Sequence, residues 1–500
     1  MENERDVRTL DRPGGLAGGP LGNLAAGGEP PGRRRRGRWI AAGVVASLLV
    51  GCGVVLWPAR SGPKEPPEPA PGTQALAAVA LGVPASLPDL AVLIGQREAE
   101  VKARPQDAHA WAVLGSAYVE RGRRTADAAN YPRAERALRA SLKARPRGNA
   151  DALGGLAALA NARRDFRAAR TWGEAALKAD PKRWTTYPLL LDAYTGLGDY
   201  KATGRTLDKL SELRSGPAGL ARIGAVYRDR GWREDAAASL ADAAAGAATP
   251  AEQAAWLERA GQLSWERGER EEALSHFDEA VRLDPDQRAA QAGQGRALAA
   301  LGRTTEALNA YRVALAGQPS PRYALELGEL YESLGLVQAA KVEYDLLRAR
   351  VRAGAAGGVD DELVLGVFES DHGDPWAALR RLRTEWRRQP GIEVADALGW
   401  ALHRTGDDKE ALRFATAATD KAHGGGVRSA LYVYHRGIIE REVERYGPAR
   451  RHLQEALRIN PHFSPLRVPL ARQALAALGD VPDEPVPTGA SPVPAAPPAS

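Results

Sequence analysis

Only a few residues of this chain have the types and spacing that chemistry requires. Asp371, His372 and Asp374 place two carboxylates and an imidazole within four positions, and such groups bind metals or transfer protons. Gly373 lies among them, however, and Asp and Gly are common turn formers, so we interpret this segment as a turn between two helices. The acidic run 360–362 precedes a predicted helix, where carboxylates stabilise the N-terminal dipole.

Other catalytic and metal-binding patterns are missing from the sequence. It contains no P-loop, no His-Glu-x-x-His and no serine within Gly-x-Ser-x-Gly. The eight histidines have no ligand spacing, and His276 beside Phe277 is interpreted as a packing residue. The single cysteine, Cys52, excludes an internal disulfide and any multi-cysteine zinc or iron–sulfur site. We therefore expect no enzymatic activity, no cofactor and no metal.

A repeated pattern dominates the sequence between residues 257 and 319. The first copy contains Gly268, Ala273, Phe277, Ala280 and Pro285. The second copy contains Gly302, Ala307, Tyr311, Ala314 and Pro319. Corresponding residues lie 34 positions apart, a period typical of helical-hairpin repeats.

The residue types of one copy predict its structure. Ala273, Phe277 and Ala280 are three or four positions apart and therefore share one face of a helix. The alanines allow close helix approach, and the aromatic ring is expected to fill the gap between neighbouring hairpins. Gly268 is expected to end the first helix in a left-handed conformation, and Pro285 to end the second helix.

This pattern resembles that of the tetratricopeptide repeat (TPR) family. The first half of the family's signature is matched by Trp111, Leu114, Gly115 and Tyr118. Later units repeat parts of it at Gly224, Tyr227, Gly328, Tyr331, Leu398, Gly399 and Gly437. The resemblance implies an all-α fold, a right-handed superhelical solenoid of about ten TPR helix-turn-helix units. Three departures are expected: an insertion near 123–131 and irregular connectors at 241–254 and 351–358.

The N-terminal region predicts attachment to a membrane. Residues 1–38 are expected to be a disordered tail that ends in an arginine run, and residues 39–57 an uncharged transmembrane helix. Because the arginines precede this helix, the N-terminus is expected in the cytoplasm and the repeats outside it. Residues 58–86 are expected to be a proline-rich linker. With one such transmembrane helix, the protein is expected to be a single-pass protein of the cell membrane. The alanine- and arginine-rich composition with few lysines indicates a high-GC bacterial source.

A second interpretation of the anchor remains open. Residues 49–52 resemble a lipobox, which makes Cys52 a candidate lipidation site. The apolar run continues to Trp57, as a spanning helix would, and Trp57-Pro58-Ala59 fits poorly with signal-peptide cleavage.

The ends of the array are expected to carry capping helices. Leu90, Leu93, Ile94 and Val101 define one apolar face within a predicted N-terminal capping helix, 87–107. The TPR array is expected at 108–461, a C-terminal capping helix at 462–478, and a disordered Pro/Ala-rich tail at 479–500.

The family resemblance implies that the first helices line a concave groove that binds a peptide or a partner helix. The expected groove residues are Arg228, Glu258, Gln262, Trp265, Arg296, Arg322, Glu329, Asp396, Trp400, Arg404 and Tyr434. For the two tryptophans, packing between helices is an equally good interpretation. The net charge of +6 on 68 basic and 62 acidic groups, with five arginines in the N-terminal run, argues against nucleic acid as the ligand. We therefore predict a membrane-anchored scaffold for protein partners, or alternatively an accessory factor of an envelope enzyme or secretion complex.

Overall fold

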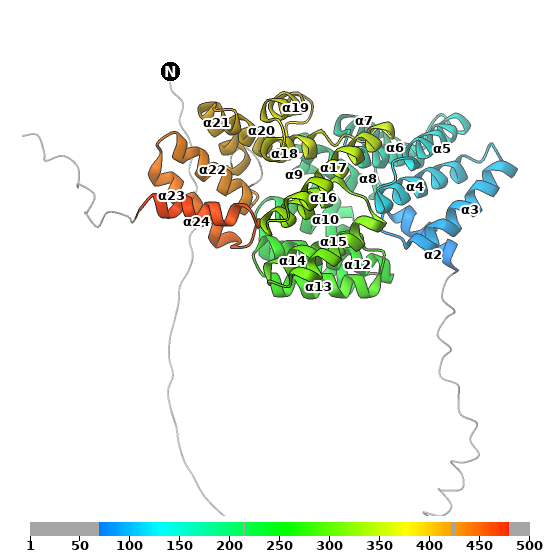
Figure 1. The fold of residues 1–500 in the computed structure, drawn as a ribbon. Coiled ribbons are helices and arrows are strands. Elements are labelled where there is room, and N and C mark those ends of the chain that lie inside the picture. The colour runs from blue at the N-terminus through cyan, green and yellow to red at the C-terminus, as the bar shows by residue number, and fades with distance from the viewer. Residues whose placement is uncertain (1–69, 214–215, 422–425, 480–500) are drawn as a thin grey trace, which may run out of the picture. The chain divides into compact units, whose positions relative to one another are not determined.

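A computed structural model describes residues 70–213, 216–421 and 426–479 (Figure 1). These residues form 23 helices and no strand, so the all-α prediction is confirmed. No helix in this part of the chain has the length and apolar character needed to cross a bilayer. The arginine run, the predicted anchor at 39–57, Cys52 and the tail from 480 onward lie outside the described residues.

The helices follow one another as an N-terminal pair, ten hairpins and a last single helix. The N-terminal pair is α2 (Pro71–Leu81) and α3 (Leu87–Ala103). The first five hairpins are α4 (Ala108–Thr125) with α5 (Asn130–Ala144), α6 (Ala150–Ala162) with α7 (Phe166–Ala179), α8 (Thr186–Gly196) with α9 (Tyr200–Leu213), α10 (Pro217–Asp229) with α11 (Arg233–Ala245), and α12 (Pro250–Glu266) with α13 (Arg270–Leu283). The next five are α14 (Arg288–Ala300) with α15 (Thr304–Gly317), α16 (Pro321–Ser333) with α17 (Val337–Ala356), α18 (Glu362–His372) with α19 (Pro375–Arg388), α20 (Ile392–Arg404) with α21 (Asp408–Thr419), and α22 (Ala430–Glu442) with α23 (Tyr446–Ile459). The last helix is α24 (Arg467–Ala477).

Glycine turns join the helices of a hairpin as predicted. Gly268 and Gly302 have φ angles of 83° and 76°, in the left-handed region that glycine adopts at low cost. After Gly268, the Glu269 amide donates to the Ser264 carbonyl over 2.9 Å, which satisfies an otherwise free group at the end of α12.

Phe277 shows how neighbouring hairpins pack. Its side chain on α13 is fully buried, as are Ala273 and Ala280 on the same face. A β-carbon added to Gly261 on α12 or Gly293 on α14 would lie 2.7 or 2.5 Å from the Phe277 ring. The aromatic side chain therefore fills the gap between two first helices, and glycine leaves the space for it.

Helices α2 and α17 extend into segments that the sequence analysis placed outside helices. The predicted linker, 58–86, contains α2, which begins at Pro71, a residue suited to the first helical turn, and is closed by Gly82 with a φ of 67°. The connector predicted at 351–358 was wrong because α17 continues to Ala356, through alanines that favour helix and a buried Val351.

The connector predicted at 241–254 is also mostly helical. Only residues 246–249 separate α11 from α12, and the Thr249 hydroxyl accepts a hydrogen bond from the Glu252 amide over 3.2 Å. The predicted insertion near 123–131 corresponds to a longer connection, in which α4 ends at Thr125 and α5 begins at Asn130.

Hairpins that are distant in the sequence contact one another. Arg124 at the end of α4 forms an ion pair of 2.6 Å with Asp284 after α13, and both side chains are 6% exposed. The Phe166 amide donates to Gln389 Oε1 over 2.9 Å, across 223 positions. Arg163 at the end of α6 donates from its Nε atom to the Gly357 carbonyl after α17 over 2.9 Å. The array therefore coils so that its later hairpins pack on its earlier ones.

The C-terminal end is attached to the middle of the array in the same way. Asn460 Nδ2 donates to the Trp265 carbonyl over 2.7 Å, and both groups are buried. The predicted N-terminal cap also packs as expected: Leu90, Leu93, Ile94 and Val101 are its buried residues.

Candidate partner-binding surface

Eight of the eleven predicted groove residues fall into two groups with different surroundings. One group lies on α10 and α12; with neighbouring residues it forms a central cluster, defined as Arg228, Asp229, Glu258, Arg259, Gln262 and Glu266. The other group belongs to a C-terminal network, defined as Glu329, Asp371, Asp396, Trp400, Arg404, Tyr434, His435 and Arg467. Arg296 and Arg322 lie between the two groups, and Trp265 is 9% exposed and packs in the core.

Arg228 and Glu266 form the best-ordered ion pair of the central cluster. The Arg228 Nε and Nη2 atoms donate to the two Glu266 carboxylate oxygens over 2.8 and 2.6 Å, a bidentate arrangement. Gln262, one turn earlier on α12, donates to Glu266 Oε1 over 2.8 Å. Burial by itself would raise the pKa of Glu266, but the charge of Arg228 and the hydrogen bonds from Arg228 and Gln262 together offset this effect, and the pKa is lowered.

Asp229, the neighbour of Arg228, behaves differently. Burial raises its pKa to about 6, and the charge of Arg228 only partly opposes this effect. Glu393 on α20 adds to the increase, so its carboxylate lies near enough to α10 for the two charges to interact. The central cluster thus faces charged groups from a hairpin more than 160 positions away in the sequence.

Glu258 and Arg259 are the charged residues of the central cluster without an ion-pair partner within the described part of the chain. Burial raises the pKa of Glu258, although several arginines oppose the effect. Burial also lowers the pKa of Arg259 to about 9, and the like charge of Arg222 contributes. The Arg259 guanidinium lies 5.1 Å from the centre of the Trp256 ring, which fixes its direction. Two adjacent, opposite and partly accessible charges therefore remain free to bind a ligand.

Arg296 and Arg322 share one carboxylate. Glu326 Oε1 lies 3.5 Å from Arg296 Nη1 and 3.3 Å from Arg322 Nε, and Glu326 Oε2 accepts from the Tyr311 hydroxyl over 3.2 Å. The Arg322 side chain is 63% exposed. The surrounding protein by itself would lower the pKa of its guanidinium, but the nearby carboxylates of Glu326 and Glu393 raise this pKa above its ordinary value. Arg322 is therefore exposed to solvent but bordered by other charged side chains, a position from which it could contact a ligand.

The C-terminal network is held together by Arg467 of α24. Its guanidinium pairs with Glu329 of α16 over 3.0 Å and with Asp371 of α18. Burial would raise the pKa of both carboxyl groups, but the charge of Arg467 and the hydrogen bonds that each group accepts together offset it, and both pKa values are lowered. Arg404 of α20 adds a hydrogen bond of 3.1 Å to the Ser370 carbonyl. Glu329 and Arg404 are thus already engaged within the fold.

The aromatic and acidic members of the C-terminal network are interior residues. Asp396, Trp400 and Tyr434 are 5%, 8% and 2% exposed. Trp400 Nε1 donates to both Asp371 oxygens over 3.0 and 3.1 Å, and its ring stacks on that of His435 at 4.2 Å. The expectation that these three residues and Trp265 face a ligand is therefore corrected: the structure packs them between helices, the other interpretation that the sequence allowed for the tryptophans.

Several residues at the two clusters were missed by the sequence analysis. Asp229, Arg259 and Glu266 each directly follow a predicted position on the same helix, so a wider window on the repeat register would have included them. Arg467 left no such signal because its partners lie 138 and 96 positions away.

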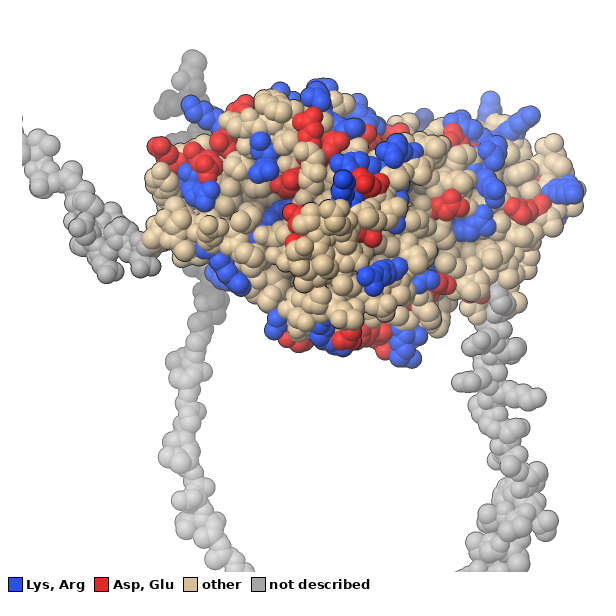
Figure 2. Space-filling view, in the orientation of Figure 1, with Lys and Arg blue, Asp and Glu red and all other residues tan. Residues whose placement is uncertain are grey.

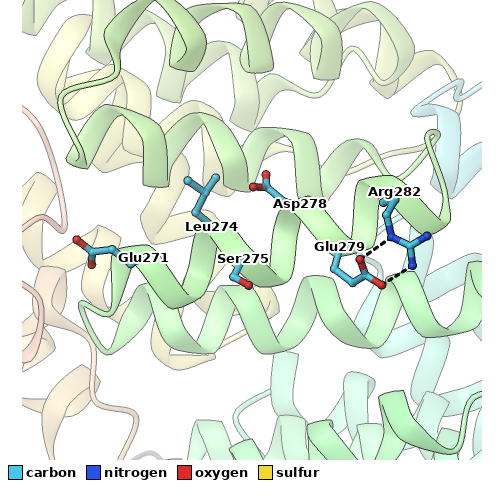
Figure 3. A pocket seen from close by; sticks show the side chains of 6 residues that line it. All are labelled: Glu271, Leu274, Ser275, Asp278, Glu279 and Arg282. Carbon is cyan, nitrogen blue, oxygen red and sulfur yellow. Dashed lines mark hydrogen bonds and ion pairs between the residues drawn. The ribbon is translucent and has the colours of Figure 1, made fainter.

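Two shallow depressions lie on the second helices of the hairpins. The first, of about 440 Å³, is lined by residues of α13 alone, namely Glu271, Leu274, Ser275, Asp278, Glu279 and Arg282 (Figure 3). The second, of about 600 Å³, is lined by residues that include Trp386 of α19 and Phe414 of α21. A surface formed by one helix does not enclose a small molecule.

No metal-binding arrangement occurs in the parts of the chain that the structure describes, where no three His, Cys, Asp or Glu side chains could hold an ion together. His372 lies 3.4 Å from Glu329 and 3.2 Å from Glu332, and Asp374 caps α19 by accepting from the Trp376 amide over 2.9 Å. Asp371 and His372 thus form the end of α18, and Gly373 and Asp374 are the turn to α19 that the sequence analysis proposed.

Comparison with known proteins supports the repeat family. Residues 121–183, 259–321 and 292–352 match the profile of the tetratricopeptide repeat. A curated relative, cellulose synthase 1 operon protein C of Komagataeibacter xylinus, is 27% identical over 364 residues; the match covers 68% of this chain but only 22% of that protein.

Two solved structures are similar to this chain at low sequence identity. A tetratricopeptide repeat protein from Parabacteroides merdae ATCC 43184 is 17% identical with a TM-score of 0.32, covering 53% of this chain and 99% of that one. The human IFIT1 dimer with PPP-AAAA is 16% identical with a TM-score of 0.43, covering 70% of this chain and 82% of that one.

Proposed function

We propose that this chain is a scaffold that binds a protein segment through its central cluster. The observation that supports this function best is the pair Glu258 and Arg259, adjacent opposite charges on α12 without ion-pair partners in the described residues. The C-terminal network is a weaker candidate because Arg467 occupies its carboxylates.

The proposed ligand is a polar peptide segment that presents an acidic and a basic side chain. A carboxylate would pair with Arg259, and a basic group would pair with Glu258. Each new pair would offset part of the cost of keeping a partly buried charge without a partner. Arg228, already fixed by Glu266, would serve as a rigid neighbour rather than as a new contact.

The test is a crosslinking pull-down from native membranes with a charge-swapped variant, Glu258→Arg/Arg259→Glu. The swap keeps the net charge but reverses both contacts, so we expect the partner to be lost. Alanine variants of Trp265 or Trp400 would not be informative, because both side chains are core residues.

The matched control is the swap Glu279→Arg/Arg282→Glu on the outer face of α13. These two side chains are 43% and 67% exposed and pair with each other, so their exchange leaves the fold and the central cluster unchanged. A partner retained by the wild type and the control but lost from the α12 swap supports the proposal. Equal recovery by all three proteins refutes it, and recovery of nucleic acid instead of protein would refute the proposed ligand class.

We further propose that the scaffold is anchored in the cell membrane by residues 39–57, with the repeats outside the cytoplasm. The supporting observation is the uncharged run preceded by arginines. Protease added to intact, wall-stripped cells should digest the repeats, and their protection would contradict this orientation. Incorporation of a clickable fatty acid that disappears in Cys52→Ala would favour a lipid anchor instead.

A second candidate function is that of an accessory factor for an envelope enzyme or secretion complex. It is favoured by the partial match to cellulose synthase 1 operon protein C, whose name places it with a polysaccharide synthase. In that case the pull-down should recover subunits of a membrane enzyme complex, and the α12 charge swap should lower the activity of that complex. Normal activity with the swapped variant would argue against this role.

A further inference from the structure

Helix α17 is apolar on two opposite faces. Its inner face, formed by Ala340, Tyr344, Leu347 and Val351, packs into the hydrophobic core. Its outer face carries a second stripe, which we define as Ala339, Val342, Leu346, Ala349, Ala353 and Ala356. Val342 is 57% and Leu346 is 40% exposed, and the last three alanines are exposed as well. A helix with two apolar faces is normally buried on both.

The spacing of the outer stripe matches that of a helix–helix seam. Its residues are separated alternately by three and four positions, which is the a and d pattern of paired helices. The stripe runs along most of the 20 residues of α17, about 30 Å of helix. The equivalent face of α13 is instead polar and charged, as its Ser275, Glu279 and Arg282 show (Figure 3).

Further apolar surface borders this stripe. Leu336 and Val337 at the start of α17 are 48% and 62% exposed, and Val313 on α15 is 39% exposed. In Figure 2 the middle of the visible face, over α15 and α16, is largely uncharged and is bordered by charged side chains. An exposed apolar surface bordered by charged side chains is typical of a site of association.

We propose that two copies of this chain associate through the outer stripe of α17, with the two helices antiparallel. In this arrangement Leu346 lies opposite Ala349 of the second copy, and Val342 lies opposite Ala353 of the second copy. Each layer then pairs a large side chain with a small one, which allows close packing. A parallel pair would instead place Leu346 against Leu346 and Ala349 against Ala349, with crowded and empty layers in alternation.

The flanking charges complement one another in the same antiparallel register. Asp345 and Arg352 are both exposed beside the stripe, and the antiparallel pair places Asp345 of each copy opposite Arg352 of the other. Arg352 makes no ion pair within the described residues, whereas Asp345 pairs with Arg348 over 2.9 Å and keeps 62% of its side chain exposed. Charges at such flanking positions determine the orientation of paired helices.

The test measures the oligomeric state of the full chain in detergent, by sedimentation, at concentrations up to about 100 μM. We expect the wild type to form a dimer and Leu346→Glu to be monomeric. The matched control is Val92→Glu on α3, an apolar side chain of similar exposure, 43%, which should leave the dimer intact. Unchanged circular dichroism establishes that each variant is folded.

Charge variants identify the antiparallel register. Asp345→Arg and Arg352→Asp should each weaken the dimer at least about tenfold, because each places like charges opposite one another at two sites. An equimolar mixture of the two variants should dimerise again, since every flanking pair is then attractive, and so should the double variant. A monomeric wild type, a dimer insensitive to Leu346→Glu, or a mixture that stays monomeric would each overturn the proposal. The partner-binding test changes α12 and the dimer test changes α17, so failure of either proposal leaves the other untouched.

Discussion

Replacing Asp284 by alanine should loosen the contact between the first hairpin and the segment that follows α13. Arg124 Nη2 and Asp284 Oδ2 are 2.6 Å apart, 160 positions separate them, and only 6% of either side chain is exposed. The substitution leaves a buried guanidinium without its carboxylate. Arg124 keeps one partner, the Ala85 carbonyl, at 2.7 Å from its Nη1 atom.

The structure sets the expected size of the effect. Removing one member of a buried ion pair costs about 3–5 kcal/mol because the other charge remains desolvated. The remaining hydrogen bond to Ala85 places Asp284→Ala near the lower limit, about 3 kcal/mol. The double variant Arg124→Met/Asp284→Leu should lose much less, since it buries no charge and fills a similar volume.

The assay should report local stability, because an array of repeats need not unfold in a single step. Native-state hydrogen exchange can follow α4 and α14, the helices on either side of the ion pair. Asp284→Ala should speed exchange in both helices, and the double variant should largely restore the protection. If Asp284→Ala changes the opening free energy of both helices by less than about 0.5 kcal/mol, the contact does not stabilise the coiled array.

Two further predictions concern a turn and a titrating carboxyl group. Gly268→Ala and Gly302→Ala both force alanine into the left-handed region, which costs about 1–2 kcal/mol. Gly268→Ala should cost more, because its β-carbon would lie 3.0 Å from Pro461 whereas Gly302 has open space; equal losses in urea unfolding would contradict the contact with the C-terminal segment. Burial raises the pKa of folded Asp229 from 3.8 to about 6, so its contribution to stability is fully present below the lower value and is lost as the pH rises through the higher one. Asp229→Asn should therefore be more stable than the wild type by about 3 kcal/mol at pH 7 and by less than about 1 kcal/mol at pH 4, and a pH-independent difference would refute the assignment.

Local features of the chain could be predicted because the sequence repeats them. The spacing of Ala273, Phe277 and Ala280 identified a buried helix face, and Gly268 and Gly302 identified the turns. These inferences depend on contacts within a hairpin or between neighbouring hairpins, where residue type and spacing decide the outcome. Prediction was less successful at α2 and at the end of α17, where proline and glycine suggested breaks that alanine-rich segments override.

The candidate site was predictable only in part. The repeat register located Arg228, Glu258 and Gln262 on the helices of the central cluster, but it could not separate them from Trp265 and Trp400, which the fold buries. A side chain that points into the groove can bind a ligand only if no residue from a distant hairpin already pairs with it. The repeat register does not reveal such pairs, of which Arg467 with Glu329 is an example.

The sequence by itself therefore determined the all-helical hairpins, their period and the faces that pack between neighbours. Tertiary structure alone decided that Arg467 would occupy the carboxylates of α16 and α18 and that Arg124 would reach Asp284. The physical reason is that each repeat adds a small rotation, and these rotations accumulate over many hairpins before distant parts of the chain meet. No local pattern encodes that sum of rotations, which also leaves Val342 and Leu346 of the outer stripe of α17 exposed among the described residues.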